Sequence, residues 1–92
     1  MKSILQTEKS CLVCKTTYDL HLHHCFYGSS NRKNSEKYGL TVYLCGRHHN
    51  MSNNGVHFNK ELDNKIKRFA QEEFEKKHTR EEFRAIFGKS WL

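Results

Sequence analysis

Two pairs of metal-binding residues stand out in the sequence, and each pair has a spacer of two residues. Cys11 and Cys14 form the first pair, and Cys45 and His48 form the second. Zinc takes four nitrogen and sulfur ligands in a tetrahedron, and a two-residue spacer lets both members of a pair reach one ion. The two pairs therefore predict a structural zinc site. His49 is an alternative to His48, but the two-residue spacer favours His48.

The compartment expected for this chain argues against disulfide bonds. Residues 1–10 lack the apolar run of a secretory signal, and no stretch of about 18 apolar residues is present to cross a membrane. We therefore expect a cytoplasmic protein with no membrane partner, and in a reducing cytosol these cysteine spacings favour metal over a disulfide. A thioredoxin-like redox site would require a βαβ pattern around Cys11 and Cys14, which the sequence lacks. Cys25 is expected to be a small residue of the core.

Four of the seven histidines form two adjacent pairs, His23–His24 and His48–His49. If His48 binds zinc, His49 is rotated by about 100° around a following helix and points away from the zinc. A single histidine would be interpreted as a hydrogen-bonded structural residue. Two pairs beside one zinc-tied hairpin instead indicate a functional site, because ionisable groups converge at such sites. Strand alternation separates His23 from His24, so the sequence leaves open whether both serve one site.

The charge and length of the chain limit its class. Sixteen Lys and Arg against ten Asp and Glu give a net charge of +6 with neutral histidines, which is typical of nucleic-acid-binding proteins but also of a solvated basic surface. The 92 residues form one domain, and 36% of them are hydrophobic, which excludes a disordered chain. So short a chain has a thin core, and we expect a metal ion to stabilise it.

The elements that must position these residues follow from hydrophobic patterns. Residues 18–27 alternate, with Leu20 and Leu22 on one face, and predict a strand. The expected order is a strand at 18–27, a surface loop at 28–37, a second strand at 40–45, a short helix at 46–54 closed by Gly55, and two further helices. This order predicts a small α+β domain with a C-terminal pair of helices.

Both C-terminal helices carry capping signals. Asn59 caps the first, and Thr79 with Glu82 forms a capping box for the second. Gly88 should end the second helix. Apolar residues at spacings of three and four predict the buried faces, which comprise Leu62, Ile66, Phe69, Ala70 and Phe74 in the first helix and Phe83, Ile86 and Phe87 in the second.

The order Cys-x-x-Cys, Leu-His-Leu-His-His, hairpin and Leu-Cys-x-x-His-His resembles the HNH endonucleases, whose motif folds as ββα around a metal. The resemblance covers residues 11 to 58 and implies a treble-clef-like core there, with a helical tail at 59–92. The pattern is also similar to small phage and prophage nucleases related to the RecA-dependent recombination-enhancement (Ref) nuclease. The shared motifs are His-His-Cys at 23–25, Asn-Arg-Lys at 31–33, Tyr-Gly-Leu at 38–40, His-His-Asn at 48–50 and Gly-Val-His at 55–57.

The resemblance implies a role for each histidine of the motif. His24 matches the general base, and His23 and His49 match ligands of a catalytic Mg²⁺ or Mn²⁺ ion. His57 and Asn53 are candidates for a third ligand. Cys11, Cys14, Cys45 and His48 match the structural zinc set. The middle Asn of the motif is missing, because Leu40 occupies its place.

The resemblance implies a metal-dependent DNA endonuclease, and the chemistry fits what these residues can do. Phosphodiester hydrolysis needs an activated water, which a histidine can supply, and stabilisation of charge on the phosphate, which a divalent ion can supply. Backbone contacts that are indifferent to DNA sequence are expected from Arg32, Lys33, Lys37 and Arg47. The resemblance to the Ref nuclease also implies a recombinase filament as a candidate partner. The alternative is a catalytically inactive zinc module that binds nucleic acid, for which the missing Asn is the argument.

Overall fold

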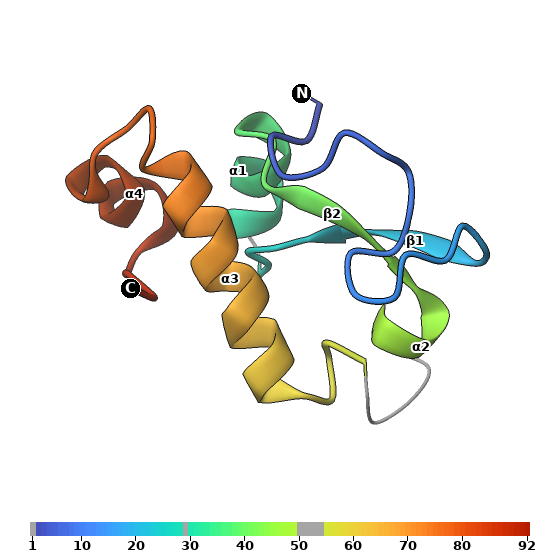
Figure 1. Cartoon of the computed structure of the whole chain (residues 1–92). Coiled ribbons are helices and arrows are strands. Elements are labelled where there is room, and N and C mark those ends of the chain that lie inside the picture. Colours follow the sequence, from blue (N-terminus) through green and yellow to red (C-terminus); the bar gives the residue numbers. More distant parts are fainter. Residues whose placement is uncertain (1, 29, 50–54) are drawn as a thin grey trace.

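The computed structural model of the chain describes residues 2–28, 30–49 and 55–92 and shows a small α+β fold (Figure 1). Its elements are β1 (Leu20–His24), α1 (Asn31–Lys37), β2 (Thr41–Cys45), α2 (Gly46–His49), α3 (Lys60–Phe74) and α4 (Arg80–Phe87). The predicted α+β class and the C-terminal pair of helices are confirmed. Within the described residues, no helix is long and apolar enough to cross a membrane.

The sheet consists of β1 and β2, which pair antiparallel with Leu20 opposite Cys45 and His24 opposite Thr41. β1 is shorter than the predicted strand, because Asp19 has a left-handed φ of 52° that interrupts the extended backbone before Leu20. The N-terminal segment lies beside β2, where the Leu12 backbone N–H donates to the Tyr43 carbonyl at 2.9 Å. Because α2 follows β2 without a linker, its residues start at the end of the sheet that carries Cys45.

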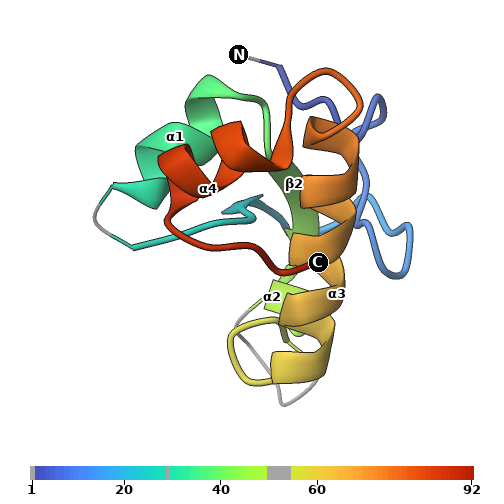
Figure 2. The ribbon, with the colours of Figure 1, turned by 90° about the vertical axis from the view of Figure 1, so that its left-hand side faces the viewer.

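The prediction of a surface loop at 28–37 was wrong, because Asn31–Lys37 forms helix α1. This helix has no apolar face, and only Ser35 is buried in it. The Ser35 hydroxyl donates to the Phe26 carbonyl at 2.6 Å, and the side-chain amide of Asn34 donates to the Ile86 carbonyl of α4 at 3.2 Å. Figure 2 shows α1 and α4 together at the end of the molecule away from α2. Contacts with distant residues hold α1, so the local pattern did not predict it.

The C-terminal helices begin and end as predicted. The Asn59 side chain accepts from the Leu62 backbone N–H, the Thr79–Glu82 capping box is present, and Gly88 ends α4 in the left-handed conformation. The predicted faces are buried at Ile66, Ala70, Phe74, Phe83 and Phe87, and are half-buried at Leu62, Phe69 and Ile86.

The core joins the helices to the sheet through aromatic rings. Phe26 follows β1, and its ring centroid lies 5.1 Å from Phe83, 4.7 Å from Phe87 and 4.9 Å from Trp91. Cys25 is fully buried beside it, as expected of a core residue. The predicted short helix at 46–54 is observed as α2 at Gly46–His49, and residues 50–54 lie outside the described residues.

Candidate metal centres

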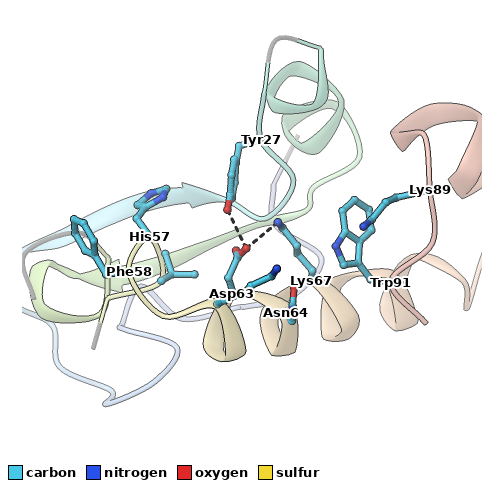
Figure 3. A pocket seen from close by; sticks show the side chains of 10 residues that line it. Tyr27, His57, Phe58, Asp63, Asn64, Lys67, Lys89 and Trp91 are labelled. Atoms are coloured by element: carbon cyan, nitrogen blue, oxygen red, sulfur yellow. Dashed lines mark hydrogen bonds and ion pairs between the residues drawn. The ribbon is translucent and has the colours of Figure 1, made fainter. Parts of the chain in front are cut away.

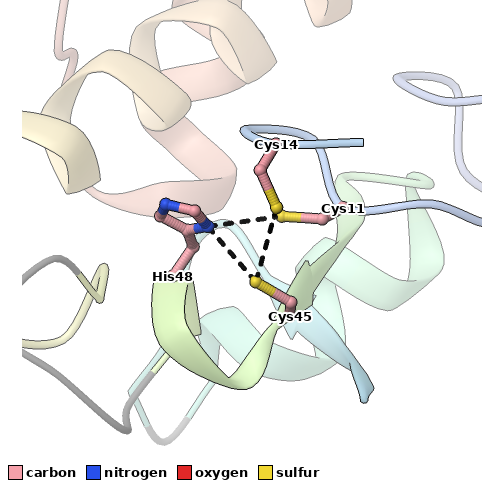
Figure 4. Close-up of side chains that lie close together, drawn as sticks. All are labelled: Cys11, Cys14, Cys45 and His48. Carbon is pink, nitrogen blue, oxygen red and sulfur yellow. Dashed lines mark hydrogen bonds between the residues drawn. The ribbon is translucent and has the colours of Figure 1, made fainter. Parts of the chain in front are cut away.

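The four predicted zinc ligands come together at the junction of β2 and α2 (Figure 4). Cys45 ends β2 and His48 lies in α2, while Cys11 and Cys14 lie on a turn of the N-terminal segment. Lys15 has a φ of 67° and returns the chain, so that its backbone N–H donates to the Cys11 carbonyl at 2.9 Å. The turn thus brings two sulfurs against the sheet end.

Two of the three distances within this group match the edges of a tetrahedral site, and the third, from Cys45 to His48, is shorter. The sulfurs of Cys14 and Cys45 are 3.7 Å apart, and the His48 Nδ1 atom lies 3.2 Å from the Cys45 sulfur and 3.7 Å from the Cys11 sulfur. Zinc bonds of about 2.3 Å to sulfur and 2.0–2.1 Å to nitrogen give tetrahedron edges of about 3.5–3.8 Å. The group could therefore hold a metal ion such as zinc.

The thiols of this group are free and differ in acidity. Burial opposes ionisation of Cys11, but backbone hydrogen bonds from Cys14, Cys45 and Val13 stabilise its thiolate and lower its pKa to about 6. Burial raises the pKa of Cys45, and contacts with the other two thiols add to the increase. One thiolate therefore forms readily at neutral pH, and a bound cation would favour ionisation of the others.

A second group that could hold a metal ion consists of His23 on β1, His49 on α2 and His57. The ring centroids form a triangle with sides of 5.4 Å (His23–His49), 5.5 Å (His23–His57) and 4.7 Å (His49–His57). One ring nitrogen from each lies within 4.8 Å of the others. The His57 backbone N–H donates to the His49 carbonyl at 3.1 Å, which links His57 directly to the last residue of α2.

The nitrogens of this triangle are suited to metal binding. The Nε2 atoms of His49 and His57 lie 3.1 Å apart, which is close to the separation of two nitrogens on one ion at about 2.0–2.1 Å. His23 is buried, and its Nε2 atom has no hydrogen-bond partner within the described residues. Burial lowers the pKa of His23 to about 3, helped by repulsion from the rings of His49 and His57, and burial also lowers the pKa of His49. His23 and His49 are therefore neutral at pH 7 and offer lone pairs.

Two residues beside this triangle, Asp19 and His21, were not predicted from the sequence to belong to the site. The Nδ1 atom of His21 lies 2.9 Å from the Nδ1 atom of His49, and its Nε2 atom lies 3.2 Å from a carboxylate oxygen of Asp19. A signal for His21 was present, because it precedes His23 by two residues on the same strand and so shares its face. Asp19 gave no such signal.

His24 borders the same cavity as the triangle. This cavity measures about 240 Å³ and is lined by Leu22, His23, His24, Tyr27, Arg32, His49 and His57. It lies where β1 ends, so the adjacent residues His23 and His24 both reach it although strand alternation separates them. The His24 Nε2 atom is buried and lies 3.5 Å from a Glu36 carboxylate oxygen, without a hydrogen bond in the described part of the chain.

Of the four predicted DNA-binding residues, Arg32 alone lines this cavity. Lys33 and Lys37 are exposed on α1, and Arg47 is exposed on α2. The structure therefore brings one of the basic residues to the histidines and leaves the other three exposed on α1 and α2.

A larger cavity of about 490 Å³ adjoins the first and shares Tyr27 and His57 with it (Figure 3). In it, the Asp63 Oδ2 atom accepts hydrogen bonds from the Tyr27 hydroxyl at 2.9 Å and from the Lys67 ammonium at 2.8 Å. Lys67 also lies over the Trp91 ring, 5.4 Å from its centroid. Burial and the bond to Asp63 raise the pKa of Tyr27, so its hydroxyl keeps its proton. None of these contacts was predicted from the sequence.

Comparisons with protein-family models, curated proteins and solved structures found no match to this chain. Functional inference therefore rests on the two centres themselves. Asn53, the other candidate for a third ligand, lies outside the described residues. The ligand set supported by geometry is His23, His49 and His57.

Proposed function

We propose that this chain is a metal-dependent endonuclease of the HNH type that hydrolyses DNA phosphodiester bonds. The observation that carries the proposal is the convergence of three imidazoles on one point, with a fourth histidine, His24, on the wall of the same cavity. Perturbed, convergent ionisable groups in a cavity are typical of catalytic sites. The order of β1, β2 and α2 around the histidines supports a ββα-metal core.

The first centre is proposed to bind a structural zinc ion. Its four protein ligands leave no open position, which is typical of structural sites, whereas catalytic sites keep one for water. The ion would tie the N-terminal turn that carries Cys11 and Cys14 to the β2–α2 junction that carries Cys45 and His48. Its role is therefore to hold α2, and with it His49, beside the first residues of β1, where Leu20 pairs with Cys45.

The second centre is proposed to hold the catalytic ion on His23, His49 and His57. A bound divalent ion supplies positive charge to the phosphate oxygens and lowers the pKa of water. The sequence resemblance suggested Mg²⁺ or Mn²⁺. Three imidazoles without a carboxylate favour a transition metal ion over Mg²⁺, because Mg²⁺ prefers oxygen ligands.

His24 would act as the general base and Arg32 would bind the phosphate. His24 lines the cavity and would take a proton from the attacking water, and the Glu36 carboxylate 3.5 Å from its Nε2 atom would balance the charge of the imidazolium. Arg32 provides a planar cation on the same cavity wall for the phosphate oxygens. The adjoining cavity would bind the neighbouring nucleotides of the DNA, because its wall carries Lys60, Lys67 and Lys89. DNA contacts of this kind are largely independent of sequence.

A second candidate function is an inactive zinc module that binds nucleic acid. Leu40 stands in place of the middle Asn of the motif and is fully buried in the core, so that it presents no polar group to the site. If the three histidines support no cleavage, the missing Asn favours the inactive zinc module.

A plasmid-nicking assay tests the proposal. Zinc-loaded protein is supplied with Mn²⁺, Co²⁺, Mg²⁺ or no second ion, and wild type is compared with His24→Ala and with His78→Ala. His78 packs on Phe74 away from both centres and serves as the matched control. We expect ion-stimulated nicking that falls by about 10²- to 10⁴-fold in His24→Ala, with unchanged zinc content.

Nicking that survives His24→Ala would reject the assignment of the base. Absence of ion-stimulated cleavage, both alone and with a recombinase filament that presents the DNA, would reject the nuclease. DNA binding retained in that case would favour the zinc module.

A further inference from the structure

Asp19 and His21 form an unbroken line of polar contacts that ends at the metal triangle. An Asp19 carboxylate oxygen lies 3.2 Å from the His21 Nε2 atom, and the His21 Nδ1 atom lies 2.9 Å from the His49 Nδ1 atom. The opposite nitrogen of His49, Nε2, lies 3.1 Å from the His57 Nε2 atom. The rings of His21 and His49 meet edge to face, with an interplanar angle of 89°. His49 therefore has one nitrogen toward the triangle and the other toward His21.

When Nε2 of His49 binds an ion, only one placement of the ring protons makes each contact from Asp19 to His49 a hydrogen bond. A ligand nitrogen must present a lone pair, so neutral His49 carries its proton on Nδ1 and donates it to Nδ1 of His21. His21 then carries its own proton on Nε2, where the Asp19 carboxylate accepts it. The reverse placement would put a lone pair of His21 against the carboxylate and a proton of His49 toward the metal ion. The negative charge of Asp19 therefore selects the tautomer that binds metal.

The backbone holds Asp19 in an uncommon conformation at this point. Its φ of 52° is one of two positive φ values among non-glycine residues in the described part of the chain. Such a conformation costs about 1 kcal/mol and persists where surrounding contacts fix it. Here the Gly46 backbone N–H donates to the Asp19 carbonyl at 3.1 Å, which joins Asp19 to the first residue of α2, the helix that carries His49. The carboxylate and the metal-binding helix are thus tied together by main chain and by side chain.

We infer that Asp19 and His21 are positioning residues that set the tautomer and ring orientation of His49 at the second metal centre. The inference rests on the proposed function for the existence of that centre. Partners of metal-bound histidines usually act directly, through a carboxylate or a carbonyl group, and their loss weakens metal binding by about 10- to 100-fold. Here the exposed Asp19 carboxylate acts on His49 indirectly, through the second histidine, His21.

Metal titration of the full, zinc-loaded chain tests the inference. Co²⁺ is added at fixed pH, its visible absorption reports binding to the histidines, and zinc is quantified before and after. Asp19→Asn is the informative variant, because asparagine also tolerates a positive φ and has the same shape but lacks the charge. Glu72→Gln, an exposed change on α3, is the matched control. We expect Asp19→Asn and His21→Ala to bind Co²⁺ about 10- to 100-fold more weakly, while Glu72→Gln binds as wild type.

A second measurement separates positioning from a general loss of structure. Nitrogen-15 NMR of the histidine rings, recorded before Co²⁺ is added, should show the His49 proton on Nδ1 and the His21 proton on Nε2 in wild type. In Asp19→Asn we expect the His49 proton to shift toward Nε2, with the zinc content and melting temperature unchanged. Wild-type Co²⁺ affinity or an unchanged tautomer in Asp19→Asn would overturn the inference.

The same titration distinguishes this inference from the proposed function. A wild-type chain that binds no second ion would reject the metal centre, and the inference with it. A chain that binds Co²⁺ and loses affinity in Asp19→Asn, yet cleaves no DNA, would support the positioning role and reject the nuclease.

Discussion

Replacing Cys14 by alanine should unfold the chain, because this residue is one of four ligands of the proposed zinc. Cys14 is exposed, whereas Cys11 and Cys45 are buried. Its truncation therefore leaves no cavity in the core, and any large loss of stability reports the loss of the ion. This separates metal binding from packing more cleanly than a change at either buried ligand.

The expected magnitude follows from the size of the chain. Domains are stable by about 0.05–0.15 kcal/mol per residue, which gives about 5–14 kcal/mol for 92 residues. Structural zinc contributes about 10–16 kcal/mol of apparent binding energy in small zinc domains at pH 7. Because the two quantities are comparable, a chain that loses most of its zinc affinity retains little or no net stability.

Circular dichroism melting and elemental analysis, both under reducing conditions, measure this outcome. We expect one tightly held zinc per wild-type chain, and Cys14→Ala should lack both zinc and a cooperative transition. Cys25→Ala is the matched control, because Cys25 is a buried cysteine outside the ligand group. It should keep its zinc and lose stability modestly. A folded wild type without zinc, or a Cys14→Ala variant that melts like wild type, would refute the reasoning.

Three further predictions concern DNA binding, the core and acid stability. DNA affinity should fall steeply with increasing salt concentration, because binding releases counterions from the DNA. In a fluorescence-anisotropy titration, Arg32→Ala should reduce the slope of log K against log[salt] by about one unit, whereas the control Arg84→Ala on α4 should leave it unchanged. Phe83→Ala should destabilise the fold by about 3–5 kcal/mol in urea denaturation, because its fully buried ring packs against Phe26 at 5.1 Å; a loss below about 1 kcal/mol would contradict this packing. His23 has a pKa of about 3 in the folded chain and about 6.5 in the unfolded chain, so between these pH values the unfolded state binds one more proton. The free energy of unfolding should therefore fall as the pH decreases from 6.5 toward 3, by at most about 1.4 kcal/mol per pH unit. His23→Gln should reduce this slope, and an unchanged slope in the variant would contradict the assignment to His23.

Features of this protein that depend on short spacings could be predicted from its sequence. Two-residue spacers identified the Cys₃His group, and its four members lie together. Asn59 and Thr79 cap the helices they were predicted to cap, and the periodic positions of α3 and α4 face the core. Such features follow from the geometry of one turn or one helix, so nearby residues suffice to predict them.

Contacts between distant segments could not be predicted in this way and are seen in the folded structure. Helix α1 has no apolar period, and its stability comes from Ser35 and Asn34, which bond to residues outside it. The shared cavity of His23 and His24 depends on where β1 ends, and the line from Asp19 through His21 to His49 joins residues that are 30 positions apart in sequence. The sequence shows which groups can ionise or bind a metal. Which of these groups come into contact depends on how distant segments pack together, and local periodicity does not encode that packing.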